Sequence, residues 1–253
     1  MSQKRTALIT GATSGIGEAT ARLLADHNYR LILCGRRKER LDNLKSDLGS
    51  KTDVTVLSFD VRNKKEVSEA FQSLDEKWKQ IDILINNAGN AHGLAPIQSG
   101  SVEDWDAMID INVKGLLYVS HEVLPGMVEK NQGHIINIGS IAGKEAYPNG
   151  NVYCASKFAV DAITKGMRMD LNAHGIKVTA IHPGLVETEF SLVRFKGDEE
   201  RANTVYKGFE PLRPEDIADM ILFALTRPPH VVMADLVVFP TAQASSTIVK
   251  KNL

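Results

Sequence analysis

The amino-acid sequence predicts an α/β protein: one doubly wound, parallel, seven-stranded sheet with helices on both faces. Two observations lead to this prediction. Short apolar runs alternate with amphipathic helical patterns along all 253 residues. Several of these runs are nearly continuous in Ile, Leu and Val, which is typical of strands buried on both faces of a parallel sheet. Strands and helices that alternate in this way, joined by right-handed crossovers, cover both faces of one sheet. We expect a single domain over residues 1–253.

Seven apolar runs are the expected strands, and six amphipathic stretches are the expected helices. The strands are expected at residues 6–10, 30–34, 54–59, 81–85, 134–138, 177–181 and 235–239. The helices are expected at residues 16–27, 38–48, 64–77, 102–128, 153–172 and 214–225.

The alternation stops between residues 183 and 209, where apolar side chains are mixed with charges and no strand pattern is clear. A long irregular insertion in a compact domain is usually functional. Open α/β sheets bind ligands beyond the carboxyl ends of their strands. We therefore expect residues 187–209 to form a lid over a site at that end of the sheet.

Composition excludes several classes of partner. The chain has 30 Lys and Arg against 31 Asp and Glu, a formal net charge of -1. Because there is no basic excess to neutralise phosphates, we expect neither a nucleic acid nor an anionic membrane as partner. Two cysteines do not make a disulfide framework, which favours a reducing compartment. No apolar segment suits a signal-peptide core or a membrane span, and we expect a cytoplasmic protein.

A glycine-rich loop follows the first expected strand and opens the first expected helix. It reads Thr10-Gly11-Ala12-Thr13-Ser14-Gly15-Ile16-Gly17. Glycines at these positions permit a tight turn, close approach of the backbone to a pyrophosphate, and close packing of helix on strand. The backbone N–H groups and the helix dipole then face the phosphates. The residues expected to bind a dinucleotide here are Gly11, Thr13, Ser14, Gly15, Ile16 and Gly17.

The end of the second expected strand indicates which dinucleotide. A site for NAD would carry an acidic residue about 20 residues beyond the loop, to bind the ribose 2′-hydroxyl. This chain has Gly35-Arg36-Arg37 there, and Glu39 comes too late, inside the next helix. An arginine fork suits a 2′-phosphate, and one charge-assisted hydrogen bond of roughly 1.5–3 kcal/mol gives a preference for NADP of about 10- to 150-fold. The alternative is that Arg36 and Arg37 only begin a solvated helix.

Tyr153 and Lys157 lie four residues apart at the start of the expected helix 153–172. Residues four apart share one helical face, so the Tyr153 hydroxyl and the Lys157 ammonium can converge. Ser140 follows the fifth expected strand, at the same edge of the sheet. Each of these residues is unremarkable alone, since a Tyr/Lys pair at this spacing is more often a surface pair.

Taken together, the motifs resemble the short-chain dehydrogenase/reductase family, whose members have a Rossmann fold. The resemblance covers essentially the whole chain, with the motifs in the family's order and at its spacing. They are the glycine loop, Asn86-Asn87-Ala88-Gly89, Asn112, Ser140, Tyr153-X3-Lys157 and Pro183-Gly184.

The resemblance implies a role for each matching residue. Tyr153 would be the acid/base, and Ser140 would hydrogen-bond the same substrate oxygen. Lys157 would bind the nicotinamide ribose and lower the pKa of Tyr153, and Asn112 would position a water that links Lys157 to solvent. The further cofactor contacts that it implies are Asp60, Val61, Asn87, Ala88, Gly89, Pro183, Gly184, Val186 and Thr188.

The expected effect of Lys157 on Tyr153 requires a dry site. A free tyrosine titrates near 10, so half-ionisation around pH 7.5 requires roughly 3.4 kcal/mol. One ammonium at about 4 Å supplies only ~1 kcal/mol in bulk water, but ~4 kcal/mol at an effective dielectric near 20. We expect the lid to exclude the water.

Residues 146–150, 184–194 and 239–245 resemble the NADP-dependent 3-hydroxy acid dehydrogenases, which act on serine, allo-threonine and related acids such as 3-hydroxyisobutyrate. Such substrates carry a carboxylate and call for a cation in the pocket. Arg194 in the lid is the first candidate and Lys144 the second; the alternative for both is a solvated charge.

Two other functions stay open. One is a broad-specificity NADPH-dependent carbonyl reductase with an apolar lid. The other is a non-catalytic NADP(H)-binding regulator. The intact set of Ser140, Tyr153 and Lys157 argues against this function, because a regulator does not need it. The resemblance also implies a homotetramer built on the fourth and fifth helices. The histidines show no metal-ligand spacing, so we expect no metal site.

Overall fold

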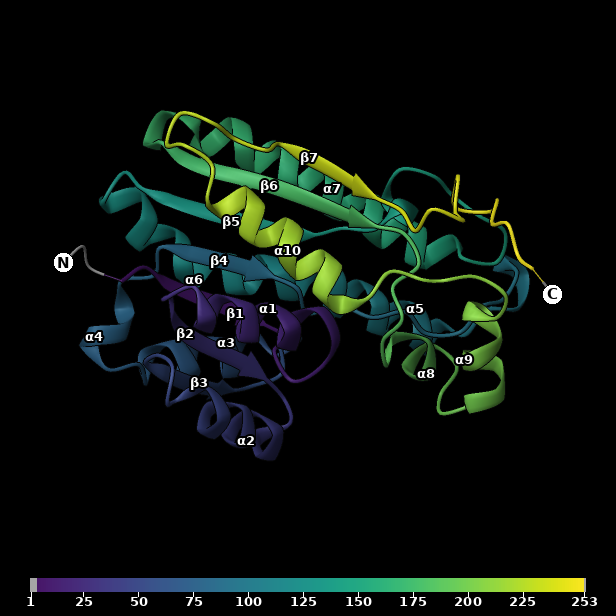
Figure 1. The fold of residues 1–253 in the computed structure, drawn as a ribbon, viewed down its shortest axis with the longest axis horizontal. Helices are drawn as coiled ribbons and strands as arrows, with labels where there is room; N and C mark the ends of the chain where they lie inside the picture. Colours follow the sequence, from purple (N-terminus) through teal and green to yellow (C-terminus); the bar gives the residue numbers. More distant parts are fainter. Residues whose placement is uncertain (1–3, 253) are drawn as a thin grey trace.

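The computed structural model describes residues 4–252, which form one parallel seven-stranded sheet in the order β3-β2-β1-β4-β5-β6-β7 (Figure 1). Every pair of neighbouring strands is parallel. The strands are β1 Thr6–Thr10, β2 Arg30–Gly35, β3 Val54–Ser58, β4 Ile83–Asn86, β5 Gly133–Ile138, β6 Ile176–Pro183 and β7 Asp235–Val238. The expected fold class is confirmed, because the chain changes direction after β3 and the sheet is wound both ways from β1.

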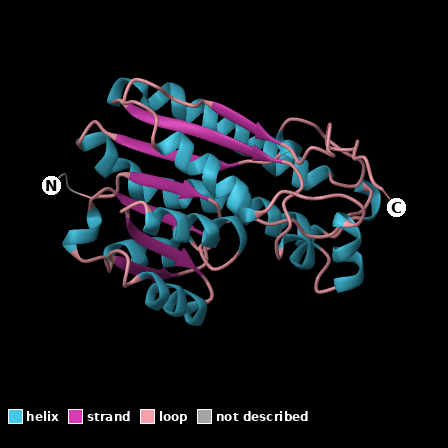
Figure 2. Cartoon of the chain, viewed as in Figure 1, coloured by secondary structure: helices cyan, strands magenta, loops and turns pink. Residues whose placement is uncertain are grey.

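Helices cover both faces of this sheet (Figure 2). The longer ones are α1 Gly15–Asp26, α2 Lys38–Leu48, α3 Lys64–Gln72, α5 Val102–Ile109, α6 Leu116–Glu129, α7 Asn151–Leu171 and α10 Pro214–Leu225. The shorter ones are α4 Glu76–Lys79, α8 Phe190–Arg194 and α9 Glu199–Tyr206. Among the described residues, no helix has both the length and the apolar character needed to cross a bilayer.

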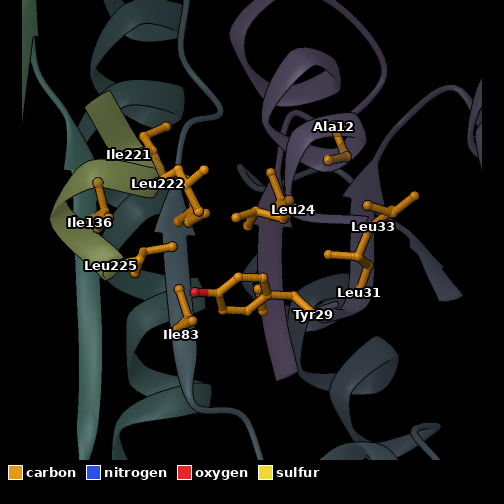
Figure 3. Packing of buried hydrophobic residues seen from close by; sticks show 14 of the residues in the cluster. Ala12, Leu24, Tyr29, Leu31, Leu33, Ile83, Ile136, Ile221, Leu222 and Leu225 are labelled. Carbon is orange, nitrogen blue, oxygen red and sulfur yellow. The ribbon is translucent and has the colours of Figure 1, made fainter. Parts of the chain in front are cut away.

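Side chains that alternate along the strands divide the core into two layers. Leu31 and Leu33 of β2 pack in one cluster with residues of α1 and α10 (Figure 3), whereas Ile32 between them packs with residues of α6 and α7 in the other. The same alternation holds along β4, where Leu84 faces the α6 and α7 side. This is the pattern of a sheet buried on both faces, and it explains the continuous apolar runs of the sequence.

Two expected helices are interrupted. The helix expected at 64–77 is divided into α3 and α4. The helix expected at 102–128 is divided into α5 and α6 by the π-helical stretch η2, Asp110–Gly115. A π-helical turn accommodates one extra residue and is frequent at functional sites. Here it contains Asn112.

The expected lid, residues 187–209, is less irregular than the sequence suggests, because it contains α8 and α9. It lies beyond the carboxyl ends of the strands, on the side to which the arrows point in Figure 1. The loops that follow β1, β2, β4, β5 and β6 reach the same edge. The fold therefore brings the segments with the sequence motifs together below the lid.

Candidate active site

A cavity of about 470 Å³ lies between the carboxyl edge of the sheet and the lid. Nearly all residues that the sequence predicted for cofactor, catalysis or substrate line it. The exceptions are Gly17, Asn112 and Lys144, which are not among its lining residues.

The glycine-rich loop is shaped by contacts that exclude side chains. Gly11 and Gly15 have positive φ angles of 64° and 53°. A Cβ atom on Gly17 would lie 2.3 Å from the carbonyl oxygen of Gly11, so Gly17 supports the loop from behind. Asn87 Nδ2 donates to the carbonyl oxygen of Thr10 at 2.9 Å and ties the loop to β4. Since α1 begins at Gly15, its positive dipole end lies at the cavity, and this cradle fits the phosphates of a dinucleotide.

The two arginines after β2 lie in different environments. Arg37 donates from Nη2 to Thr13 Oγ1 at 2.8 Å and to Ser14 Oγ at 2.7 Å, and from Nη1 to Glu189 Oε2 at 2.9 Å. Arg36 has a side chain that is 57% exposed and lies 3.7 Å from Asp60 Oδ2. Arg37 is therefore held by the loop and the lid, whereas the guanidinium of Arg36 is available at the mouth of the cavity.

Tyr153 and Lys157 project from the first turns of α7, and both side chains are buried. Lys157 Nζ donates to the carbonyl oxygen of Ile138 at 3.0 Å. Ser140 follows β5, and its Oγ accepts from the backbone N–H of Ala142 at 3.1 Å. The hydroxyl of Ser140, the phenol of Tyr153 and the ammonium of Lys157 therefore all belong to residues that line the one cavity.

The electrostatics of this trio differ from the expectation. Burial, followed by the neighbouring Tyr147, raises the pKa of the Tyr153 phenol well above its usual value, whereas hydrogen bonding with Ser140 and the charge of Arg194 act in the opposite direction. Burial also lowers the pKa of Lys157 to about 8. Both shifts have the same cause, because a dry site penalises the charged form of each group, the phenolate and the ammonium. Tyr153 is accordingly a neutral phenol at physiological pH.

Asn112 lies behind the cavity wall, in η2. Its Oδ1 accepts from the backbone N–H of Asn90 at 2.8 Å, and its Nδ2 donates to the Asn90 carbonyl at 2.8 Å and to Ser156 Oγ at 2.9 Å. A Cβ atom on Gly89 would lie 3.0 Å from Asn112 Oδ1 and 3.5 Å from Lys157 Nζ. Asn112 therefore fixes the loop after β4 close to Lys157, a role that the sequence alone did not indicate.

The two candidate cations for a substrate carboxylate are placed differently. Lys144 Nζ lies 2.8 Å from Asp161 Oδ1 and 2.6 Å from Asp235 Oδ2, outside the cavity lining. This corrects the prediction that Lys144 binds the substrate, because two carboxylates on the far side of the Ser140 loop already hold its ammonium.

Arg194 lies in the cavity. Its Nε donates to the carbonyl oxygen of Gly93 at 3.1 Å, and its Cζ lies 5.6 Å from the ring centroids of both Tyr147 and Tyr153. The backbone N–H of Gly93 donates in turn to the carbonyl of Arg194 at 2.9 Å. The guanidinium is therefore oriented from behind and lies next to the acid/base candidate.

Sequence reasoning missed several lining residues. Phe190 lies on Tyr153 with ring centroids 5.7 Å apart, and Gln243 Oε1 accepts from the backbone N–H of Leu185 at 2.9 Å. The other missed residues with functional groups in the lining are Asn90, Tyr147, Glu189, Ser191, Tyr206 and Ser246. Some belong to the segments 146–150, 184–194 and 239–245, whose resemblance to a subfamily was the available signal.

Comparison with known proteins agrees with this geometry. A family model described as short chain dehydrogenase matches residues 5–198. The NADP-dependent 3-hydroxy acid dehydrogenase of Salmonella typhi is 48% identical over 238 residues, which are 94% of this chain and 95% of that protein. Sulfoacetaldehyde reductase 2 of Chromohalobacter salexigens is 45% identical over 240 residues, with the same two shares.

A solved structure gives the same result at the level of the fold. The closed form of serine dehydrogenase complexed with NADP+ is 45% identical, has a TM-score of 0.92, and is similar over 98% of this chain and 100% of that one. The family model, the full-length relatives and this structure show that the chain belongs to the short-chain dehydrogenase family, and that it is an oxidoreductase.

Proposed function

We propose that the chain is an NADP-dependent dehydrogenase of small 3-hydroxy acids of the serine, allo-threonine and 3-hydroxyisobutyrate type. The observation that carries the proposal is the oriented guanidinium of Arg194 beside the Tyr153 ring, inside a cavity that also contains the glycine-rich loop. It is supported by relatives named NADP-dependent 3-hydroxy acid dehydrogenase and by the likeness to serine dehydrogenase.

The cofactor would lie along the glycine-rich loop, with its 2′-phosphate at the exposed guanidinium of Arg36 and its nicotinamide end near Lys157 and Thr188. NADP, when bound, supplies or accepts the hydride of the reaction. The planar, permanently charged fork of Arg36 suits a phosphate in two-point contact. The absence of a carboxylate directly after β2, where Gly35 is followed by Arg36, favours the phosphorylated dinucleotide.

The residues around Tyr153 would handle the proton. A neutral phenol can donate its proton to a carbonyl oxygen during reduction, which leaves a tyrosinate. In the opposite direction the tyrosinate would take the hydroxyl proton of the substrate and return to the phenol. The hydroxyl of Ser140 would hold the same oxygen. Arg194 would bind the substrate carboxylate through its Nη groups, because Gly93 already orients its Nε. Binding the carboxylate and the oxygen at two points positions the substrate.

Steady-state rates with NADP+ and NAD+ test the proposal. The substrates are serine, allo-threonine, 3-hydroxyisobutyrate and a simple secondary alcohol. We expect the three acids to be preferred, and NADP+ over NAD+ by about 10- to 150-fold. Equal turnover of the plain alcohol would favour the carbonyl reductase alternative, and tight NADP+ binding without any turnover would favour the regulator.

Replacing the phenol tests the assigned acid/base. We expect Tyr153→Phe to lower kcat by at least about 100-fold, since proton transfer by a positioned side chain contributes that much or more. Affinity for NADPH, measured by fluorescence titration, should stay nearly unchanged. Tyr118→Phe on α6, which is not among the lining residues of the cavity, is the matched control. Retained turnover in Tyr153→Phe would defeat the assignment.

We also propose a cytoplasmic homotetramer. Both cysteines, Cys34 and Cys154, are free and buried thiols, in keeping with a reducing compartment. Leu117 on α6 and Phe158 and Met169 on α7 are exposed apolar side chains, which supports an interface on these helices.

A further inference from the structure

A group of charged and titratable side chains, buried except for its outer member Asp235, lies behind Ser140, outside the cavity. Asp161 of α7, His182 of β6 and Asp235 of β7 place their polar atoms within 4.8 Å of one another. Such a group could hold a metal ion, but Lys144 Nζ lies within 2.8 Å of Asp161 and 2.6 Å of Asp235. An ammonium that already pairs with both carboxylates makes this an ion-pair cluster.

His182 connects this cluster to Ser140. Its side chain is 0% exposed. Nδ1 lies 3.2 Å from the carbonyl oxygen of Ser140, and Nε2 lies 2.9 Å from Asp235 Oδ1. A Cβ atom on Gly139 would lie 2.4 Å from His182 Nδ1, so the ring occupies the space that the glycine leaves. The imidazole is thus fixed between the Ser140 backbone and the edge strand β7.

Both neighbours of the ring are acceptors, and this limits its hydrogen bonds. A carbonyl and a carboxylate have no proton to donate, and a neutral imidazole has one N–H. Among the described residues, Nε2 of His182 is buried without a hydrogen-bond partner. Asp235 Oδ1 lies 2.9 Å from Nε2 but not in line for a hydrogen bond, whereas the Ser140 carbonyl oxygen is in line with Nδ1. We therefore assign the proton to Nδ1, where it donates to the Ser140 carbonyl.

The surrounding charges act on this ring in opposite directions. Burial lowers the pKa of His182, and the charge of Lys144 lowers it further, whereas Asp235, the Ser140 carbonyl and Asp161 raise it. The net direction is downward, so the ring is neutral near pH 7. A proton added at lower pH would go to Nε2, beside the carboxylate of Asp235.

We infer that His182 is a positioning residue for Ser140: its Nδ1–H holds the Ser140 carbonyl and thereby the hydroxyl that would bind the substrate oxygen. The inference rests on the proposed function, in which Ser140 contacts the substrate. Lys144, which follows the short helix Ile141–Gly143, tethers the other end of the same loop to α7 and β7. The loop that carries Ser140 is therefore held at both ends by one cluster.

Two variants at position 182 distinguish the role of Nδ1 from that of Nε2. His182→Asn can place an amide N–H where Nδ1 lies, and His182→Gln can place one where Nε2 lies. We expect His182→Asn to keep kcat within about threefold, and His182→Gln to lose about 10- to 30-fold with an unchanged KM for NADP+. Thermal unfolding and NADP+ binding establish that both variants fold. Equal losses of kcat in two folded variants would overturn the inference, because a merely space-filling ring would not distinguish them.

A second measurement needs no turnover. We expect NMR of the His182 ring to show the Nδ1–H tautomer near pH 7, and its titration to move to lower pH in Asp235→Asn, because the carboxylate that favours the imidazolium is lost. The introduced amide can donate to Nε2 while its oxygen still accepts from Lys144. An Nε2–H tautomer in the wild type, or an unchanged titration, would overturn the inference. If the NMR results are as expected but no 3-hydroxy acid is oxidised, the proposed function fails and the assignment of His182 stands.

Discussion

At the scale of single residues, Lys157 lowers the stability of the folded protein because its ammonium is buried in the candidate active site. Its folded-state pKa is about 8, below the usual 10.5, because of burial. Below pH 8 Lys157 is protonated in both the folded and the unfolded chain, and the folded chain bears the full cost of a buried charge. Between pH 8 and 10.5 the unfolded chain binds the extra proton, so this residue makes stability rise with pH.

We therefore expect Lys157→Met to abolish turnover and to stabilise the fold near pH 7. The lowered pKa of Lys157 corresponds to a cost of about 3 kcal/mol, which the variant does not bear. The gain in stability is reduced by the roughly 1–3 kcal/mol that the unpaired Ile138 carbonyl costs in the variant. Urea unfolding of both proteins at pH 7 and pH 10 measures this. The advantage of the variant should shrink at pH 10; an advantage that grows with pH would contradict the buried, partly neutral lysine.

Arg194 carries the substrate assignment, and its replacement discriminates between substrate classes. We expect Arg194→Met to raise KM for 3-hydroxy acids by about 10- to 100-fold, the value of a charge-assisted pair. KM for a neutral aldehyde of similar size should change far less. Lys144→Met is the control and should leave the ratio of the two KM values unchanged. Equal effects of Arg194→Met on both substrate classes would discard the carboxylate role.

At the scale of elements, an ion-pair network fastens the lid. Glu189 immediately precedes α8 and accepts from Arg37 Nη1 at 2.9 Å and from Arg40 Nη1 at 2.8 Å. The pairing with these arginines lowers the pKa of Glu189. Because Arg37 also binds Thr13 and Ser14, the first helix of the lid is linked to the glycine-rich loop.

Breaking this link should loosen the lid. We expect Glu189→Gln to increase the rate of trypsin cleavage within residues 194–207 by about three- to tenfold, the effect of roughly 1 kcal/mol on local opening. Glu199→Gln, on α9, is the matched control, and global stability is followed by thermal unfolding. Identical cleavage rates in the two variants would show that the pairing does not hold the lid.

The elements also show what the sequence could and could not predict. Apolar runs placed all seven strands to within two residues at either end, because strands buried on both faces have a strong local signal. The π-helical stretch η2 was missed, since one extra residue hardly alters the apolar pattern of a helix. The positions of Lys144 and Arg37 were missed for a different reason: their partners Asp235 and Glu189 are 91 and 152 residues away in the chain. Such pairings follow from the tertiary fold and leave no local pattern.

At the scale of the whole molecule, exposed apolar side chains on α6 and α7 remain to be explained. Met169 is 75% exposed and Phe158 is 43% exposed, and both project from α7. They are eleven residues apart, close to three helical turns, so they lie on the same face. Water-exposed apolar side chains that share a face favour an interface between copies.

A charge introduced on this face is therefore expected to dissociate the proposed homotetramer. A buried, unpaired carboxylate costs several kcal/mol per protomer, and a symmetric interface meets the change on both sides. We expect Phe158→Glu to lower the mass measured by light scattering after size exclusion, and to lower the thermal midpoint in a concentration-dependent way. Lys45→Glu, at an exposed polar position on α2 on the opposite side of the sheet, is the control and should leave the mass unchanged. If Phe158→Glu keeps the wild-type mass at micromolar concentration, α7 does not belong to the interface. The residues of the active site on α7 would then be held in place by their own chain alone.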